Sequence, residues 1–436
     1  MFYSHWENKN NIKEYLQKID YKKDVDKSGL PLLYESNSIY TTNTDAHSLI
    51  IGTNGSGKTQ TITLPLMKLS MLAGESVVIN DPKGEIYKST SKEFKNRGYN
   101  VVLIDFDNAI YGNYYNPLNL AYRLYKENNK DKCINVIEEV GYYIFSEINS
   151  TSDDFWTNSA IDYFTGLCLY LLEKAKKEIN LNDIFELANN LADQKECDKF
   201  LKEIGKNNAV YYNVSGTLTS PMETKGGIIA TFNQKLKQIV SKENLSNMMS
   251  KTDFDISNIT KEKTAIYIIS GYYDYSNSLI PLFVNQIFEV VNIYGKPNKK
   301  INIILDEFDQ MLPIKNFAEI INYSRNVHIN FTVLIQSFIN LNNTYGKENA
   351  DIIKYCFPNI VYLYATDLYT LEEVSKLCGH ESEKKPLISP EELKIMKQFE
   401  AIYLIPRIMP FKTELVPDWK IDWNIKFEET NFELRK

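Results

Sequence analysis

Short apolar runs alternate with longer segments of helical periodicity in two separate parts of the chain. Three such runs lie in the first part, at residues 49–51, 77–79 and 101–104. Five more follow in the second part, at residues 264–270, 301–305, 333–335, 359–364 and 401–405. Strands separated by helices are typical of parallel βαβ units. The pattern predicts an α/β fold with a mostly parallel sheet flanked by helices.

The segment between these two parts has a different periodicity. From about residue 118 to 259 the apolar positions recur at helical spacing, and the clearest helix is expected from Phe155 to Lys177. We therefore predict an all-α domain of residues 118–259, inserted into a domain formed by residues 46–117 and 260–436.

The two ends of the chain carry weaker patterns. Residues 1–45 are polar and irregular, with one short helix expected around Asn11 to Ile19, and they resemble a lead-in to the first domain. The tail after Pro417 is polar with two tryptophans, and we expect it to lie on the surface.

Composition narrows the class of protein. The 436 residues are 43% apolar with a formal net charge of −7, which argues against a surface adapted throughout to nucleic acid. Five widely spaced cysteines without a CxxC pair favour a reducing compartment over a disulfide framework or a zinc site. The most apolar helical segment, residues 160–172, contains Asp162 and is shorter than the roughly 20 residues that span a bilayer. A soluble chain is expected.

A glycine-rich loop follows the first apolar run and precedes the helix expected from Lys58 to Ala73. Its eight residues fit the spacing of a P-loop: Gly52, Thr53, Asn54, Gly55, Ser56, Gly57, Lys58 and Thr59. In such a loop the backbone N–H groups bind phosphate at the positive end of a helix. Lys58 is expected to contact the β- and γ-phosphates of ATP, and the Thr59 hydroxyl to bind Mg²⁺.

A second motif comes some 250 residues later. The apolar run 301–305 ends in Asp306 and Glu307, which is the form of a Walker B strand. Asp306 is the candidate Mg²⁺ ligand, and Glu307 is the candidate residue that orients and polarises the attacking water. A strand ending in two solvated acids is the alternative, but the preceding P-loop favours the catalytic interpretation.

Two further residues are candidates for the same assembly. Gln336 ends the run 333–335, where its carboxamide would sense the γ-phosphate or bind water; a polar strand cap is the alternative. Arg325 lies between a helix and a strand and would serve as an arginine finger toward a neighbouring subunit's nucleotide; a surface arginine is the alternative.

Together these motifs resemble the coupling ATPases of conjugation and type IV secretion, the TraG/TraD-like branch of the HerA/FtsK superfamily. The resemblance extends from about Ser4 to Ile405, and its most discriminating segment is Asp81-Pro-Lys-Gly-Glu85. It implies a RecA-like P-loop ATPase domain with an inserted all-α domain that recognises substrates. ATP hydrolysis would then drive the transfer of relaxase-bound DNA or protein.

The resemblance also implies partners and a location. The expected partners are a relaxase or relaxosome accessory proteins, weakly bound single- or double-stranded DNA, secretion-channel ATPases and membrane components. Family members work at the cytoplasmic face of the bacterial membrane, as homohexamers when anchored. Here His5 and Trp6 resemble the segment that follows the usual transmembrane helices. Either the anchor has been removed or a membrane partner replaces it, and a monomer is the alternative to the ring.

Two other functions remain open from the residues alone. One is a docking receptor with little ATPase activity of its own. The other is a DNA translocase of the HerA/FtsK type outside secretion, which shares both nucleotide-binding motifs. Asp81 to Glu85 and the large helical insert favour the coupling protein over this translocase.

Overall fold

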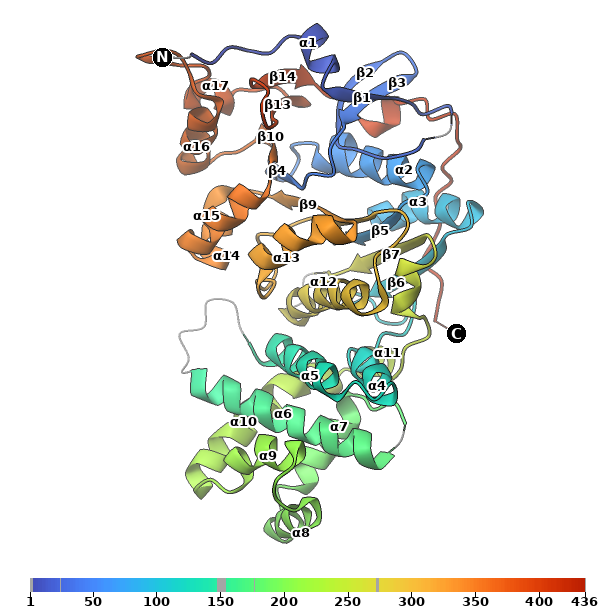
Figure 1. Ribbon diagram of the computed structural model, residues 1–436, viewed down its shortest axis with the longest axis vertical. Coiled ribbons are helices and arrows are strands. Elements are labelled where there is room, and N and C mark those ends of the chain that lie inside the picture. The colour runs from blue at the N-terminus through green and yellow to red at the C-terminus, as the bar shows by residue number, and fades with distance from the viewer. Residues whose placement is uncertain (1–2, 24, 147–153, 176, 272–273, 436) are drawn as a thin grey trace. The chain divides into compact units, whose positions relative to one another are not determined.

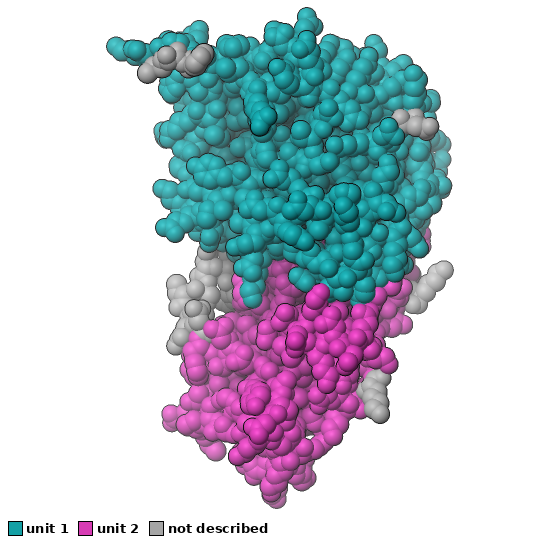
Figure 2. Space-filling view, viewed as in Figure 1, with its two compact units in different colours: residues 1–102, 257–268, 288–431 teal, residues 103–256, 269–287, 432–436 magenta. Residues whose placement is uncertain are grey.

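The computed structural model describes residues 3–23, 25–146, 154–175, 177–271 and 274–435. The chain divides into two compact units, coloured separately in Figure 2. Unit 1 comprises residues 1–102, 257–268 and 288–431, and unit 2 comprises residues 103–256, 269–287 and 432–436. The domain limits expected from the sequence stay a prediction, because compact units defined by contacts need not coincide with inserted domains.

A nine-stranded sheet carries the α/β architecture (Figure 1). Its order is β14-β13-β10-β4-β9-β8-β5-β7-β6. The bounds are β4 (Ser48–Gly52), β5 (Ser76–Asn80), β6 (Asn100–Asp105), β7 (Thr264–Ile269), β8 (Ile301–Leu305), β9 (Ile329–Ile335), β10 (Asn359–Tyr364), β13 (Glu400–Leu404) and β14 (Phe411–Glu414). Neighbours from β10 to β7 pair in parallel, whereas β13 and β14 are antiparallel. The predicted mostly parallel sheet is confirmed.

The strands β4, β5, β7 and β8 are buried along their whole length, as expected for parallel strands covered by helices on both faces. The helices that alternate with the sheet strands are α2 (Leu64–Leu72), α3 (Glu85–Asn96), α12 (Asp274–Tyr294), α13 (Phe317–Ser324), α14 (Phe338–Tyr345), α15 (Lys347–Cys356), α16 (Leu368–Cys378) and α17 (Pro390–Lys394). Short 3₁₀ turns η2 (Ile256–Thr260), η3 (Arg325–Val327) and η4 (Asp418–Lys420) and the hairpin β11 (His380–Ser382) with β12 (Lys385–Pro386) complete this part.

The helix after the glycine-rich loop begins as a π-helical turn, η1 (Thr59–Thr63), and continues as α2. The helix was expected at this place, but not its environment. Every residue from Leu64 to Met71 is buried, so α2 lacks the solvent-facing side that an amphipathic helix would have. The sheet packs against one side, and segments from both ends of the chain cover the other.

The N-terminal segment is one of the two segments that cover α2. Instead of an irregular lead-in, it forms helix α1 (Lys9–Lys13) and an antiparallel sheet of β1 (Leu16–Asp20), β2 (Pro31–Glu35) and β3 (Ser38–Thr42). The helix expected around Asn11 to Ile19 is therefore wrong in its second half. Ile19 and Ile39 pack in one cluster with Leu69 of α2. Figure 1 shows the ribbon of this small sheet near that of α2. Burial against another part of the chain overrides the local helical spacing.

The tail after Pro417 is the other segment that covers α2. The expectation that this tail lies on the surface is only partly right. Trp423 is 4% exposed and packs with Tyr21 and Leu69, whereas Trp419 is 61% exposed. Asp418 accepts a 2.6 Å hydrogen bond from the buried Lys68 of α2. Apolar contacts and one buried ion pair thus hold the tail against the first helix.

Unit 2 contains the helical segment. Within its described residues, the chain from Asn119 to Met248 forms helices without strands. They are α4 (Asn119–Lys126), α5 (Lys130–Phe145), α6 (Asp154–Ala175), α7 (Leu181–Asn190), α8 (Gln194–Ile204), α9 (Ala209–Leu218), α10 (Met222–Val240) and α11 (Glu243–Met248). The core of this unit includes Phe145, Phe164 and Phe232, all at most 1% exposed. The long helix expected from Phe155 is α6.

Candidate nucleotide-binding site

The glycine-rich loop leaves the carboxyl end of β4 and returns as η1. Thr53 N–H donates to the Tyr364 carbonyl of β10 at 3.1 Å, which fixes the start of the loop. Gly55 and Gly57 have φ of +81° and +96°, which favour glycine strongly. A Cβ on Gly52 would lie 2.5 Å from the Ser56 hydroxyl oxygen. Close neighbours at Gly52 and Gly57 therefore leave no room for a side chain, whereas at Gly55 only the backbone conformation disfavours one.

Lys58 and Ser56 fit an anionic ligand in this loop. Lys58 Nζ lies 2.5 Å from the Gly52 carbonyl oxygen, so the ammonium is folded back over the loop, and the residue is only 7% exposed. The buried Ser56 hydroxyl has no hydrogen-bond partner among the described residues. A buried cation and an unsatisfied hydroxyl in a tight loop are the groups that a phosphate would engage.

Asp306 and Glu307 follow β8 directly, at the same edge of the sheet as the loop, because β4, β9 and β8 run parallel. Glu307 N–H donates to Asp306 Oδ1 at 3.0 Å, and Asn80 Nδ2 donates to the Asp306 carbonyl at 2.8 Å. Glu307 has φ of +55°, a conformation that costs about 1–2 kcal/mol outside glycine. The turn that presents the two carboxylates is thus held by specific bonds despite local strain.

A third carboxylate, that of Asp81, directly follows β5 beside this turn. Its Oδ2 accepts from Tyr87 N–H at 2.8 Å. Burial raises the pKa of Asp81 to about 7, against the opposing effect of that hydrogen bond. Burial also raises the pKa of Asp306, which the positive charge of Lys58 partly offsets. The pKa of Glu307 is raised by burial first and by the charge of Asp306 second. A glutamate with a raised pKa is a better proton acceptor at neutral pH than an ordinary surface carboxylate.

One cavity of about 370 Å³ joins the loop and the carboxylates. Its lining includes Lys58, Thr59, Asp81, Asp306 and Glu307. Hydroxyl and carboxylate oxygens are the ligands that Mg²⁺ prefers, usually together with substrate phosphate oxygens. The described residues contain no group of three or more His, Cys, Asp and Glu that would hold a metal by themselves. The chain's donors fit a Mg²⁺ that arrives with a phosphate ligand.

Gln336 directly follows β9, the strand between β4 and β8. Its N–H donates to Asp309 Oδ2 at 2.9 Å, which ties the end of β9 to the turn after β8. Gln336 lies at the correct edge of the sheet but is not among the described residues that line the cavity. Its predicted role toward the γ-phosphate stays a prediction.

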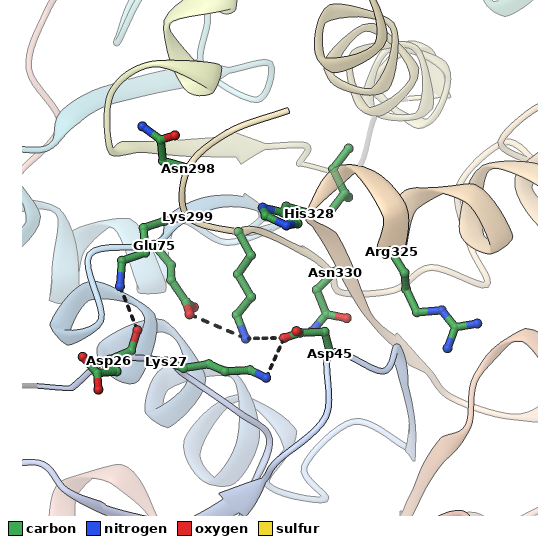
Figure 3. Close-up of a pocket in the computed structure, with 11 residues that line it drawn as sticks. Asp26, Lys27, Asp45, Glu75, Asn298, Lys299, Arg325, His328 and Asn330 are labelled. Atoms are coloured by element: carbon green, nitrogen blue, oxygen red, sulfur yellow. Dashed lines mark hydrogen bonds and ion pairs between the residues drawn. The ribbon is translucent and has the colours of Figure 1, made fainter. Parts of the chain in front are cut away.

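Arg325 lies at the opposite edge of the sheet, in η3 before β9. It lines a second cavity with Asp45, Glu75 and Lys299, residues that precede β4, β5 and β8. Figure 3 shows its side chain directed away from the Lys27–Asp45 pair of this cavity. The length of a β-strand, roughly 20 Å, separates this edge from the phosphate loop. Arg325 therefore does not reach the loop of its own chain. Its predicted contact with a neighbouring subunit stays a prediction, and a surface arginine stays the alternative.

The structure adds residues that sequence reasoning missed. Lys83, Gln398, Phe399 and Trp419 also line the cavity of the phosphate loop. Lys83 belongs to the Asp81–Glu85 segment, which the sequence singled out only for its resemblance. The two aromatic residues lie more than 300 positions from the loop: Phe399 directly precedes β13, and Trp419 lies in the polar tail. Neither position belongs to a motif that marks it as part of the site.

Comparison with known protein families identifies the family of this chain. Residues 4–398 match the family described as type IV secretory system, conjugative DNA transfer. The chain therefore belongs to the conjugative DNA transfer proteins of type IV secretion, and the predicted family and its role in conjugation are confirmed.

Solved structures share the fold at low sequence identity. The plasmid coupling protein TrwB in complex with the ATP analogue ADPNP is 14% identical, with a TM-score of 0.72 over 100% of this chain and 96% of that one. TrwB in complex with ADP and Mg²⁺ is also 14% identical, with a TM-score of 0.68 over 100% and 96%. VirB4 of Thermoanaerobacter pseudethanolicus is 13% identical, with a TM-score of 0.58 over 90% and 97%. The predicted RecA-like fold is confirmed.

No curated protein sequence matches the chain significantly. Among the described residues, no helix has both the length and the apolar character needed to span a membrane.

Proposed function

We propose that this chain is the ATPase that couples substrate recruitment to transfer in conjugation, and that hydrolysis takes place in the cavity lined by Lys58, Asp306 and Glu307. The observation that carries the proposal is that one cavity joins the phosphate loop to two carboxylates from a parallel strand. TrwB, which shares the fold, has been solved with ADPNP and with ADP and Mg²⁺, in keeping with ATP and Mg²⁺ as the ligands here.

Lys58 supplies the main positive charge. Among the described residues, its ammonium donates to two backbone carbonyls, those of Gly52 at 2.5 Å and Thr53 at 3.5 Å. These contacts hold the charge over the loop, where it stabilises negative charge on the transferring phosphoryl group. Backbone N–H groups of the loop that do not donate within the chain would bind the remaining phosphate oxygens, whereas Thr53 N–H and Ser56 N–H donate to carbonyls of the chain.

Glu307 positions the attacking water and accepts its proton. The strained turn and the hydrogen bond from its N–H to Asp306 fix its backbone. Thr59 and Asp306 would hold Mg²⁺, which supplies charge neutralisation at the β- and γ-phosphates when bound. Asp81 adds a buried carboxyl beside these residues, and its pKa near 7 limits the negative charge that ATP meets on entry.

Two substitutions test this assignment. Lys58→Ala is expected to abolish ATP turnover through loss of binding. Glu307→Gln should leave ATP binding intact and block hydrolysis, because the amide cannot accept the proton. Turnover is measured as phosphate release by the purified full chain, with ATP binding measured separately. Unchanged turnover in both variants would refute the assignment.

We also propose a ring in which Arg325 acts on the nucleotide of the next subunit. Its distance from the phosphate loop of its own chain supports a role across an interface. Mixed rings of Arg325→Ala and Glu307→Gln subunits should recover part of the activity, because some interfaces then combine an intact arginine with an intact glutamate. No recovery under conditions in which rings form would contradict this role.

The partners follow from the family and remain proposals in their particulars. The helices of residues 118–259 would bind a relaxase or relaxosome accessory proteins, and the ATPase would work with secretion-channel ATPases and membrane components at the cytoplasmic face of the bacterial membrane. Because the net charge is −7, DNA would be bound through few phosphate contacts and released by salt. ATP hydrolysis stimulated by single-stranded DNA supports a motor, whereas negligible hydrolysis in a verified hexamer supports the docking receptor.

A further inference from the structure

Two aromatic residues form a wall of the nucleotide cavity that differs chemically from its phosphate side. The phosphate side consists of backbone amides, lysine and carboxylates. Phe399 and Trp419 line the same cavity and come from the C-terminal part of unit 1. Their ring centroids lie 5.9 Å apart at an interplanar angle of 70°, which is a favourable edge-to-face contact.

Phe399 lies directly on the phosphate loop. Two of its ring carbons are 3.0 Å from the position that a Cβ on Gly57 would occupy. The residue has φ of +72°, an uncommon conformation for a bulky side chain, and its carbonyl accepts from Leu415 N–H at 2.8 Å. The adjacent Gln398 donates to the Gly55 carbonyl at 3.3 Å. These bonds hold the ring against the outside of the loop.

Trp419 is exposed although its backbone is well anchored. Its neighbour Asp418 accepts hydrogen bonds from Lys68 at 2.6 Å and from the Trp423 indole at 2.9 Å. Trp423, in the same tail, is 4% exposed and packs in the core, whereas Trp419 is 61% exposed. An indole kept in water at the edge of a ligand cavity, on a fixed backbone, is suited to contact a flat ligand group.

We propose that Trp419, supported edge-to-face by Phe399, is the nucleobase subsite of this cavity. The inference rests on the proposed ATPase function and adds the residues that bind the base. The phosphates occupy the loop of residues 52–59, and the base stacks on the indole. A cavity of about 370 Å³ lies within the range of small-molecule sites, roughly 300–1,000 Å³. Stacking depends on the face of the ring, so the subsite accepts adenine and guanine alike.

The test compares two ligands that share the phosphate chain. ADP carries a base, whereas inorganic pyrophosphate does not, and both are measured with Mg²⁺ on the full chain by calorimetry. Trp419→Ala is expected to weaken ADP binding about tenfold and to leave pyrophosphate binding within about twofold. Trp419→Phe keeps an aromatic face and should bind ADP within about threefold of the wild type. Tyr355→Ala, which removes an 87% exposed ring from α15, is the control and should change neither affinity.

Tryptophan fluorescence provides an independent measurement of base binding. ADP should quench tryptophan emission of the wild-type chain, pyrophosphate should not, and Trp419→Phe should remove the quenching. Equal weakening of both ligands in Trp419→Ala, or unchanged binding of both, would overturn the subsite. If wild-type protein binds pyrophosphate as tightly as ADP, the base makes no contact and only the proposed phosphate site remains. Binding of neither ligand by the wild type would overturn the proposed ATPase together with this inference.

Discussion

The side chain of Asn80 donates a hydrogen bond of 2.8 Å to the backbone carbonyl of Asp306. Asn80 is the last residue of β5, and Asp306 directly follows the adjacent parallel strand β8, so this bond joins the two strand ends that the carboxylates of the site follow. Asn80 is 2% exposed. The bond therefore fixes the backbone from which Asp306 and Glu307 project.

Asn80→Ala should lower ATP turnover about tenfold while nucleotide affinity stays within about threefold, because the substitution frees the carboxylate turn and leaves the phosphate loop intact. The free energy of unfolding should fall by about 1–3 kcal/mol, since the Asp306 carbonyl loses a buried donor. Steady-state kinetics separate the effect on kcat from that on KM. Asn349→Ala removes an exposed amide from α15 and is the control. A change confined to KM would contradict this positioning role.

Gly57→Ala should reduce nucleotide affinity at least tenfold. The left-handed φ of +96° strains any side chain, and the new methyl group would press on the Phe399 ring at 3.0 Å. Gly295→Ala is a matched control, because that residue has φ of +99° with no atom within 4 Å of the added carbon. Both variants should lose about 1–2 kcal/mol of stability, but only Gly57→Ala should lose affinity. Equal affinity in the two variants would show that contact with Phe399 is unimportant.

Lys68→Ala should destabilise the chain by about 3–5 kcal/mol, because it leaves the Asp418 carboxylate buried without its ion pair. The two side chains are 6% and 11% exposed, and the ammonium also lies 4.0 Å from the centre of the Phe427 ring. Lys22→Ala breaks the more exposed pair with Asp422 in the same tail and should cost less than about 1 kcal/mol. Urea unfolding of both variants gives the comparison. Similar losses in the two variants would mean that the tail is not anchored through Lys68.

Acid should destabilise the fold through His47, whose pKa burial lowers from 6.5 to about 4. The ring is held neutral: Nδ1 accepts from Phe331 N–H at 3.0 Å, and Nε2 contacts the Ile321 carbonyl at 3.0 Å. Between pH 6.5 and 4 the unfolded chain binds the extra proton, so the contribution of His47 is complete above pH 6.5 and is lost as pH falls. The loss amounts to about 3 kcal/mol.

His47→Gln cannot titrate, so the difference in unfolding free energy between wild type and variant should shrink as pH falls from 7 to 4.5. Carboxylates titrate alike in both proteins and cancel in this difference. Parallel stability curves for the two proteins would contradict a buried neutral His47.

Much of the fold was predictable because each βαβ unit carries its own local signal. The apolar runs at 77–79 and 301–305 lie inside β5 and β8, and the glycine spacing of residues 52–57 marks a loop that few other sequences would form. The N-terminal sheet was missed because its strands are five residues long and gain their stability from contact with α2. The spacing of apolar residues within these short segments does not reveal that they contact α2.

The residues of the candidate site likewise fall into those that the sequence predicts and those that only the structure reveals. Lys58 and Asp306 are found from their motifs, because phosphate and Mg²⁺ demand particular residues at fixed spacing. Asn80 acts through one hydrogen bond to a strand that is distant in sequence, and Trp419 reaches the cavity from a tail held by Lys68. Such residues can be recognised only from the structure. The contacts that define their roles join segments that are distant in the sequence and follow no fixed spacing.

The central claim is that residues 52–59 bind the phosphates of ATP. The most direct measurement is the equilibrium affinity for ATP with Mg²⁺ of the wild-type chain and of Lys58→Ala, with the exposed lysine variant Lys384→Ala as control. The account predicts saturable binding by the wild type and by Lys384→Ala, and a loss of at least tenfold in Lys58→Ala, because a charge-assisted contact to phosphate is removed. Equal affinity in all three proteins, or no binding by the wild type, would contradict it.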